Sequence, residues 1–163
     1  KNRSENYYDS LITKNELRFE WVDNFDDFYP ILIKNKEKHN AKPTHTLKEL
    51  ETLKSLFPNE ILQLMLYDNK NPIGGMTVFM ANQNSLIIFY SMFDYTYSSM
   101  QPIILLMQYV IKWAKKNKLQ FIDYGISHQP NTDDSLALNE SLIKFKEEFG
   151  CFASIRNTYR KSE

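Results

Sequence analysis

Cysteine is nearly absent from this sequence of 163 residues, in which Cys151 is the only one. A single cysteine cannot form an internal disulfide, and no Cys/His grouping has the spacing of a zinc site. The three histidines come without a carboxylate cluster, which also argues against a metal site. The sequence therefore predicts a chain without a metal that suits a reducing compartment, with the cytoplasm as its default location.

The net charge is zero, because twenty basic residues balance twenty acidic ones. No long-range field therefore attracts DNA, another polyanion or a membrane surface. No apolar run approaches the roughly 20 residues that span a bilayer, and the start shows no signal-peptide pattern. These absences disfavour nucleic-acid binding and predict no membrane span.

The sequence does contain enough apolar material for one domain. Hydrophobic residues make up 42% of it and aromatic residues 14%, which suits one core but is too little for two ordinary ones. The chain begins KNRSENYYDS without an initiator Met, so we expect a processed chain or a piece of a longer one. Residues 1–16 are polar with scattered aromatics and are interpreted as an arm or inter-domain linker before a single domain at 17–163.

Hydrophobic periodicity predicts ten elements in the remaining chain, with apolar residues alternating in strands and recurring every three to four residues in helices. These elements are strand 18–22, helices 25–39 and 46–57, strands 60–67, 72–81 and 85–93, helix 100–116, strand 119–125, helix 137–149 and strand 151–159.

Local signals refine these elements. Thr46 and Glu49 have the spacing of a capping box at a helix start. Pro30 either lies in the first turn of its helix or kinks it. Gly74 and Gly75, inside a strand, indicate a bulge or a place where another group approaches the backbone closely.

Strands 85–93 and 119–125, with the apolar helix between them, form a β-α-β unit whose strands should run parallel with a right-handed crossover. The whole order predicts an α/β (α+β) fold with a mixed, mostly antiparallel sheet and helices on both faces. Ligands of open α/β sheets bind outside the carboxyl ends of parallel strands. We therefore expect residues 92–95 and 124–128 to flank a ligand site.

This order of elements resembles the GNAT N-acetyltransferase fold. The segment FIDYGISHQPNTDDSLALNESLIKFKEEFG is similar to the end of GNAT-like domains in Fem-type (FemAB/FemX-like) acyltransferases, which show D-[FY]-G-I-S, a loop and L-N-x-x-L-x-x-[FQ]-K-x-x-F-G. The matching residues are Asp123, Tyr124, Gly125, Ile126, Ser127, Leu138, Asn139, Leu142, Lys146, Phe149 and Gly150. KPTHTLKELETLKSLFP also resembles the family's segment after its first helix.

The resemblance covers roughly residues 17–160 and implies the C-terminal half of a longer protein, with an N-terminal GNAT-like half as a partner. It implies transfer of an acyl group from a thioester such as acetyl-CoA or another acyl-CoA to a small-molecule amine acceptor. Two alternatives stay open: a transferase that uses aminoacyl-tRNA, as the Fem peptidyltransferases do, and a non-catalytic half-domain that binds a ligand or a partner domain.

Three departures from the family pattern stand beside the resemblance. The chain reads DYTYSSMQPI where relatives have a glycine-containing acetyl-CoA loop. The pair His128-Gln129 replaces the Thr-Glu of many relatives. Helix 137–149 contains no tyrosine of the kind that many GNAT acetyltransferases use to protonate the leaving thiolate.

Residues before the buried helix 100–116 are the candidates for binding the donor, because the N–H groups and dipole at a helix start suit a pyrophosphate. Alternatively, Ser98 or Ser99 only caps the helix. Phe93 and the motif residue Asn139 complete the predicted donor-binding set, whose other members are Tyr97, Ser98, Ser99, Met100 and Gln101.

The candidates for catalysis are Asp123, Tyr124, Ser127, His128 and Lys146. Asp123 stands in an apolar strand, where a structural bond to the next loop is favoured over a role in orienting or deprotonating the amine. Tyr124 is either a site residue or part of the core with a solvated hydroxyl. His128 can act as a general base near neutral pH or be plain surface. Periodicity points Lys146 to solvent, whereas the resemblance associates it with the active site; His45, beside a helix start, either caps that helix or touches substrate.

Overall fold

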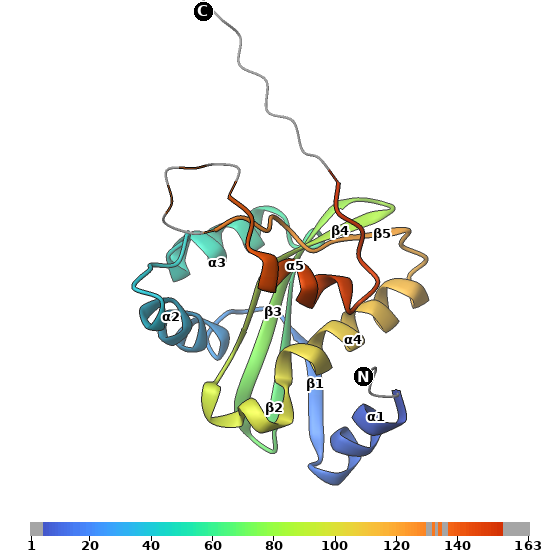
Figure 1. Cartoon of the computed structure of the whole chain (residues 1–163). Coiled ribbons are helices and arrows are strands. Elements are labelled where there is room, and N and C mark those ends of the chain that lie inside the picture. The colour runs from blue at the N-terminus through green and yellow to red at the C-terminus, as the bar shows by residue number, and fades with distance from the viewer. Residues whose placement is uncertain (1–4, 130–131, 133, 135–136, 155–163) are drawn as a thin grey trace, which may run out of the picture. The chain divides into compact units, whose positions relative to one another are not determined.

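The computed structural model describes residues 5–129, 132, 134 and 137–154, which belong to two compact units (Figure 1). The first unit ends at Gly125 and the second begins at Ile126. The first contains α1 (Glu5–Lys14), β1 (Leu17–Val22), α2 (Phe28–Lys38), α3 (Leu47–Leu56), β2 (Ile61–Asp68), β3 (Asn71–Asn82), β4 (Ser85–Phe93), the 3₁₀ helix η1 (Tyr95–Met100), α4 (Pro102–Lys116) and β5 (Phe121–Asp123). The second contains α5 (Glu140–Glu147).

A mixed five-stranded sheet forms the centre of the first unit. Its strand order is β1-β2-β3-β4-β5, with antiparallel pairing from β1 to β4 and parallel pairing between β4 and β5. The predicted meander and the parallel β-α-β unit are therefore confirmed.

The carboxyl ends of β4 and β5 do not lie side by side, which corrects the prediction from the sequence. β5 is three residues long, and its last residue, Asp123, is paired with Ile87. β4 continues beyond that pair to Phe93, a stretch of about 20 Å at the usual rise of a strand. We call residues 88–93 the open half of β4, because among the described residues no strand pairs with its β5 side.

Helices cover both faces of the sheet, as predicted (Figure 1). On one face α2 and α3 bury a cluster that includes Phe28, Leu32 and Leu50 with Met65 of β2. On the opposite face lies α4, where the Tyr109 ring stacks on Phe19 of β1 with centroids 4.5 Å apart. Because strand side chains alternate between faces, one sheet supplies apolar residues to both layers.

Local sequence signals set the boundaries of α2 and α3. Pro30 lies in the first turn of α2, where it does not kink the helix. The predicted capping box is formed: the Glu49 amide donates to Thr46 Oγ1 at 3.2 Å, and the Thr46 amide donates to Glu49 Oε2 at 2.7 Å. The Thr46 amide and the Thr46 hydroxyl both donate to the Glu49 carboxylate and hold its pKa below its usual value.

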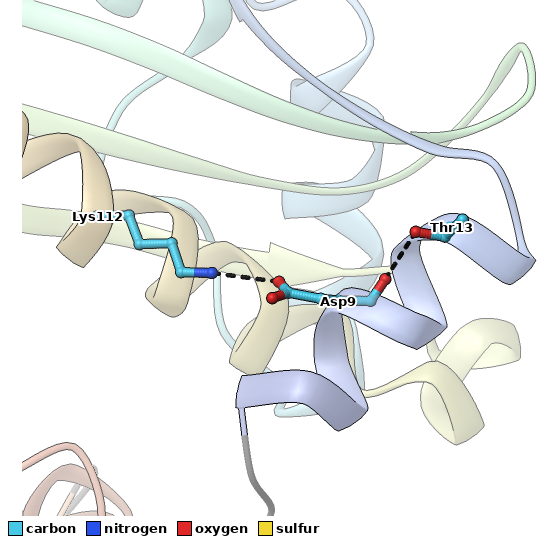
Figure 2. Close-up of polar contacts among 3 residues, drawn as sticks. All are labelled: Asp9, Thr13 and Lys112. Carbon is cyan, nitrogen blue, oxygen red and sulfur yellow. Dashed lines mark hydrogen bonds and ion pairs between the residues drawn. The ribbon is translucent and has the colours of Figure 1, made fainter.

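Residues 5–14, interpreted from the sequence as part of an arm or linker, form the helix α1. Figure 2 shows Lys112 of α4 paired with Asp9 of α1, with Nζ and Oδ1 3.2 Å apart, and the Thr13 hydroxyl donating to the Asp9 carbonyl. Tyr8 is buried, and its hydroxyl donates to Gln101 Oε1 at 3.4 Å. The buried tyrosine and these polar bonds fix a segment whose polar composition gave little helical signal.

The end of the chain differs from the prediction in two places. The helix predicted at 137–149 is shorter, because Asn139 forms its N-cap and α5 ends at Glu147. Gly150 follows with a positive φ of 78°, as its predicted role beyond a helix end requires. Of the strand predicted at 151–159, residues 151–154 are not in a strand, and residues 155–159 lie outside the described part of the chain.

At Gly75, α2 approaches the sheet closely. A Cβ at Gly75 would lie 2.6 Å from Phe28 Cδ2 and 2.8 Å from Met65 Sδ, both buried. The close approach predicted from the sequence is confirmed here. A bulge also lies beside Gly74, because Leu66 is paired with Gly74 whereas Tyr67 is paired with Pro72.

We expect Gly75→Ala to lower the free energy of unfolding by about 1–3 kcal/mol, because the new methyl group forces the Phe28 ring out of a packed site. Urea unfolding followed by circular dichroism measures this change. An unfolding midpoint equal to that of the wild type would mean that Phe28 moves aside without cost.

Candidate functional site

The residues predicted for catalysis fall into both units, and each unit is considered by itself. Asp123 and Tyr124 end the sheet of the first unit, whereas Ser127, His128 and Lys146 belong to the second. The donor-binding candidates from Phe93 to Gln101 lie in the first unit, and Asn139 lies in the second.

Asp123 is exposed and makes a structural bond. Its Oδ1 accepts a hydrogen bond from the Gly125 amide at 2.7 Å, and Gly125 has a positive φ of 72°. The expectation of a carboxylate inside an apolar strand is wrong, because β5 is a short edge strand whose Phe121 is 67% exposed. The favoured interpretation, a bond to the following loop, is confirmed, and Tyr124 next to it is half-buried.

In the second unit, Lys146 holds α5 to the segment that follows β5. Its Nζ donates to the Ile126 carbonyl and to Ser127 Oγ, both at 2.8 Å. Lys146 is half-buried rather than turned to solvent as periodicity indicated. Its geometry gives the motif lysine a structural role, while its predicted catalytic role stays a prediction.

We call the contacts between residues 126–129 and residues 137–146 the brace of the second unit. Asn139 and His128 belong to it together with Lys146. The Asn139 amide donates to the Ser127 carbonyl at 3.0 Å, and Asn139 Oδ1 caps α5 by accepting from the Leu142 amide at 3.0 Å. His128 forms an isolated antiparallel bridge with Leu138, and its side chain is exposed. The contacts among these motif residues thus connect the loop to the start of α5.

At the start of α4, the N-cap position is occupied by Gln101, with a left-handed φ of 54° and no capping bond from its side chain. The interpretation of Ser98 or Ser99 as the cap is therefore wrong; both are exposed in η1. Pro102 has no amide hydrogen, and the amides of Ile104 and Leu105 donate to the Gln101 carbonyl. An anion here would rely more on the helix dipole than on a set of N–H groups.

The end of β4 is held from two sides. Asn35 of α2 is buried, and its Nδ2 donates to the carbonyls of Phe93 at 2.8 Å and Ile31 at 2.9 Å. The Phe93 ring lies 4.7 Å from that of Tyr95, between centroids. Sequence reasoning missed Asn35, although a polar residue spaced three and four positions after Leu32 and Ile31 on the apolar face of a helix was the available signal.

A shallow pocket of about 330 Å³ lies beside this end of β4. Its lining includes Tyr97, Asp94 and Asp27. Bonds from the Thr96 amide and hydroxyl lower the pKa of Asp94. Burial, followed by the hydrogen bond to Asp27, raises the pKa of Tyr67 to about 12.

A second pocket, of about 320 Å³, lies between α2 and the loop before α3. Tyr29, Ile33 and Glu37 line it from one side of α2, and Ala41, Lys42, Pro43, His45 and Thr46 line it from the loop. Thr46, not His45, caps α3, so the capping alternative for His45 is wrong. His45 instead packs on the open half of β4, with its ring centroid 5.5 Å from that of Phe89 and its Nδ1 3.5 Å from the Tyr90 hydroxyl.

A β-bulge places these two aromatic residues together. Thr77 is paired with Tyr90 and Val78 with Ile88, so Phe89 is an extra residue in β4. Phe89 and Tyr90 both pack in the cluster under α2, although neighbouring strand residues normally point to opposite faces. Bulges of this kind commonly redirect side chains next to active sites.

Among the described residues, no group of three or more His, Cys, Asp or Glu side chains is placed to hold a metal ion. In the same part of the chain, no helix has the length and apolar character needed to cross a bilayer.

Comparison with known proteins decides the family. A model of the FemAB family matches residues 3–155. The chain belongs to the FemAB family. This membership supports a transferase of the GNAT or Fem type as the function class, and no curated protein sequence matches the chain.

Solved structures similar to this FemAB-family chain show its fold. A possible acetyltransferase from Clostridium difficile has a TM-score of 0.66 at 10% identity, covering 90% of this chain and 97% of that one. A ribosomal-protein-alanine N-acetyltransferase from Brucella melitensis has a TM-score of 0.61 at 10% identity, with 90% and 99% covered. An aminoglycoside acetyltransferase from an uncultured soil metagenomic sample, in complex with sisomicin, has 0.57 at 12%, with 93% and 99% covered. The GNAT fold expected from the order of elements is confirmed.

We expect Lys146→Ala to loosen the brace of the second unit, because it removes two hydrogen bonds to residues 126 and 127. Hydrogen exchange of the Asn139 and Gln129 amides should accelerate about fivefold, which corresponds to roughly 1 kcal/mol. Lys144→Ala is the control, since Lys144 is exposed on the same helix. Equal amide exchange rates in the Lys146→Ala and Lys144→Ala variants would contradict the structural role of Lys146.

Tyr67→Phe tests the bond to Asp27, in which the Tyr67 hydroxyl donates to Oδ2 at 2.9 Å. Because the pKa of Tyr67 is raised in the folded state, its contribution is fully present below pH ~10 and is lost as the pH rises toward 12. Urea unfolding should show a variant that is less stable than the wild type at pH 8, with a gap that narrows by pH 11. A gap that stays constant over this range would contradict the role of the hydroxyl.

Proposed function

We propose that this FemAB-family chain is an N-acyltransferase that moves an acyl group from a CoA thioester, such as acetyl-CoA, to an amine. The observation that carries the proposal is the open half of β4, whose β5 side has no partner strand among the described residues. It contains a bulge at Phe89, and His45, which lines the neighbouring pocket, packs on it. All of these features lie within the first unit.

The open half of β4 suits an extended donor that carries amide groups. A strand edge without a neighbour presents main-chain donors and acceptors, and an extended chain of amides can pair with them as an added strand does. The pantetheine arm of CoA is such a chain.

Acyl transfer from a thioester to an amine needs a neutral nucleophile, donors for the developing oxyanion and a proton for the leaving thiolate. A bulge leaves its extra residue unpaired, so the backbone near Phe89 is our candidate oxyanion donor. The exposed residues Ser98 and Ser99, with the dipole of α4, are our candidates for the phosphate end of the donor. A CoA donor also fits the cytoplasmic location predicted from the single cysteine.

The second candidate is a non-catalytic half-domain that completes a site with an N-terminal GNAT-like half or binds a ligand without turnover. Two observations favour it. Asp123 bonds to the Gly125 amide, and Lys146 bonds to Ile126 and Ser127, so both have structural roles. Aminoacyl-tRNA, the other donor implied by the family resemblance, receives no support from the zero net charge.

Acetyl-CoA at one hundred times its dissociation constant should stabilise the protein by about 2.7 kcal/mol, which raises the melting temperature by roughly 5–10 °C in a domain of this size. Amide chemical shifts measured by NMR should change in residues 88–93, with the edge strand β1 as an internal control. Stabilisation by an aminoacyl-tRNA alone would identify the Fem-type donor. No stabilisation by any donor, or shifts confined to β1, would contradict the proposed function.

A further inference from the structure

His45 lines the pocket between α2 and the loop before α3, and its side chain packs on the open half of β4. Its carbonyl accepts a hydrogen bond from the Tyr29 hydroxyl at 3.3 Å, which fixes the loop against α2. Its ring packs against Phe89, and its Nδ1 faces the buried Tyr90 hydroxyl. The backbone of the loop is therefore fixed by α2, while the half-buried imidazole packs on β4.

The contact with Tyr90 determines which ring nitrogen is available. In the tautomer whose Nδ1–H donates to the Tyr90 hydroxyl, Nε2 is the unprotonated nitrogen, and among the described residues it has no hydrogen-bond partner. His45 also lines the pocket of about 320 Å³, so a molecule in that pocket meets a histidine with one oriented and one unused nitrogen.

We propose that this pocket binds the acceptor amine and that His45 is its general base, with Tyr90 as a positioning residue. The proposal rests on the proposed acyltransferase function and assigns a side to each substrate. The donor occupies the open half of β4, which begins after the pair of Ile87 with Asp123. The acceptor approaches from the α2 face, where the bulge places the rings of Phe89 and Tyr90 next to His45.

The proton balance of the step involves His45 alone. The neutral amine attacks the thioester carbonyl, a C–N bond forms, and Nε2 of His45 takes the proton that the nitrogen loses. The C–S bond then breaks, and the protonated imidazole returns this proton to the departing thiolate, so that an amide and a free thiol leave the site. Because the imidazole protonates the thiolate, the step needs no tyrosine in α5 as the proton donor, and α5 contains none.

The lining of the pocket indicates the class of amine. Tyr29, Ile33 and Pro43 supply apolar walls, while Glu37 and Lys42 contribute one charge of each sign. Lys36 adds a positive charge, with its Nζ 6.0 Å from the centre of the Tyr90 ring. A surrounding without net negative charge does not favour a polycation, so the acceptor is a primary amine on an apolar, uncharged stem.

Several titratable groups surround His45 and bear on any pH profile. Tyr90 faces it from β4, and Tyr29 and Glu37 face the pocket from α2. Lys42 comes from the loop itself, and Glu49 of α3 interacts with His45 electrostatically. The Tyr90→Phe variant separates the effect of the hydroxyl from the effect of these charges, because it removes no charge.

The kinetic test follows the release of free CoA thiol from acetyl-CoA with n-hexylamine or spermine as the acceptor. We expect faster turnover with hexylamine. His45→Ala should lower kcat by at least a hundredfold and leave the KM for acetyl-CoA within twofold. Tyr90→Phe should lower kcat by a smaller factor, again with the KM for acetyl-CoA within twofold. His39→Ala is the control, because His39 is an exposed histidine at the end of α2.

A binding measurement tests the pocket independently of turnover. In NMR titrations with n-hexylamine, the resonances of His45 and Ala41 should shift saturably in the wild type. Ala41→Trp, which fills the pocket from an exposed position, should abolish these shifts while the protein stays folded. Absence of shifts in the wild type, or shifts that persist in Ala41→Trp, would overturn the acceptor pocket.

The outcomes separate this inference from the proposed function. Normal turnover by His45→Ala, with an active wild type, would overturn the role of His45 and leave the acyltransferase function standing. If acetyl-CoA neither binds nor is consumed with any amine, the acyltransferase function fails and the base role fails with it. Saturable hexylamine shifts would then support an amine-binding pocket alone.

Discussion

The packing of Phe28 against the backbone of Gly75 is the contact on which the first unit depends. Because glycine has no side chain, the Phe28 ring of α2 lies directly on the backbone of β3. Even one additional carbon at Gly75 would clash with this ring. This approach sets the height of α2 above the sheet. It also brings Asn35 close enough to hold the carbonyl of Phe93 and brings Tyr29 within reach of the loop that carries His45.

The two halves of β4 follow from the same arrangement. Its first residues are paired on both sides, whereas the half from residue 88 onward is paired with β3 alone among the described strands. An exposed strand edge invites association, and here the bulge, the α2 layer and Asn35 hold its residues in place. A strand that is held in place and yet unpaired on one side suits an extended ligand, because its main-chain groups are already ordered.

Elements with strong local signals were predictable from the sequence. Thr46 and Glu49 satisfy each other's backbone at the start of α3, and the apolar helix between two strands required a parallel crossover. The length of β5 was not predictable, because its pairing depends on how far β4 runs beside it. Helix α1 was missed for a related reason: its stability comes from Tyr8 and Asp9, which meet Gln101 and Lys112 far along the chain.

The candidate site shows the same division between local and distant information. The sequence motif led to Asp123 and Lys146, yet Asp123 bonds within its own turn and Lys146 bonds across a loop to residues 126 and 127. The contact of His45 with Tyr90 joins residues 45 positions apart, and the bulge at Phe89 adds a second ring on the same side. No short-range pattern reports such a contact.

A motif made of residues that bond to one another identifies a fold before it identifies a reaction. Ser127, Asn139 and Lys146 satisfy each other's polar groups within the second unit, so their spacing is explained without a substrate. His45 differs, since one of its nitrogens is oriented by Tyr90 while the other makes no bond within the described chain. Chemistry requires a group that is positioned and still unsatisfied, and that condition favours the α2 side of β4 as the place where the reaction occurs.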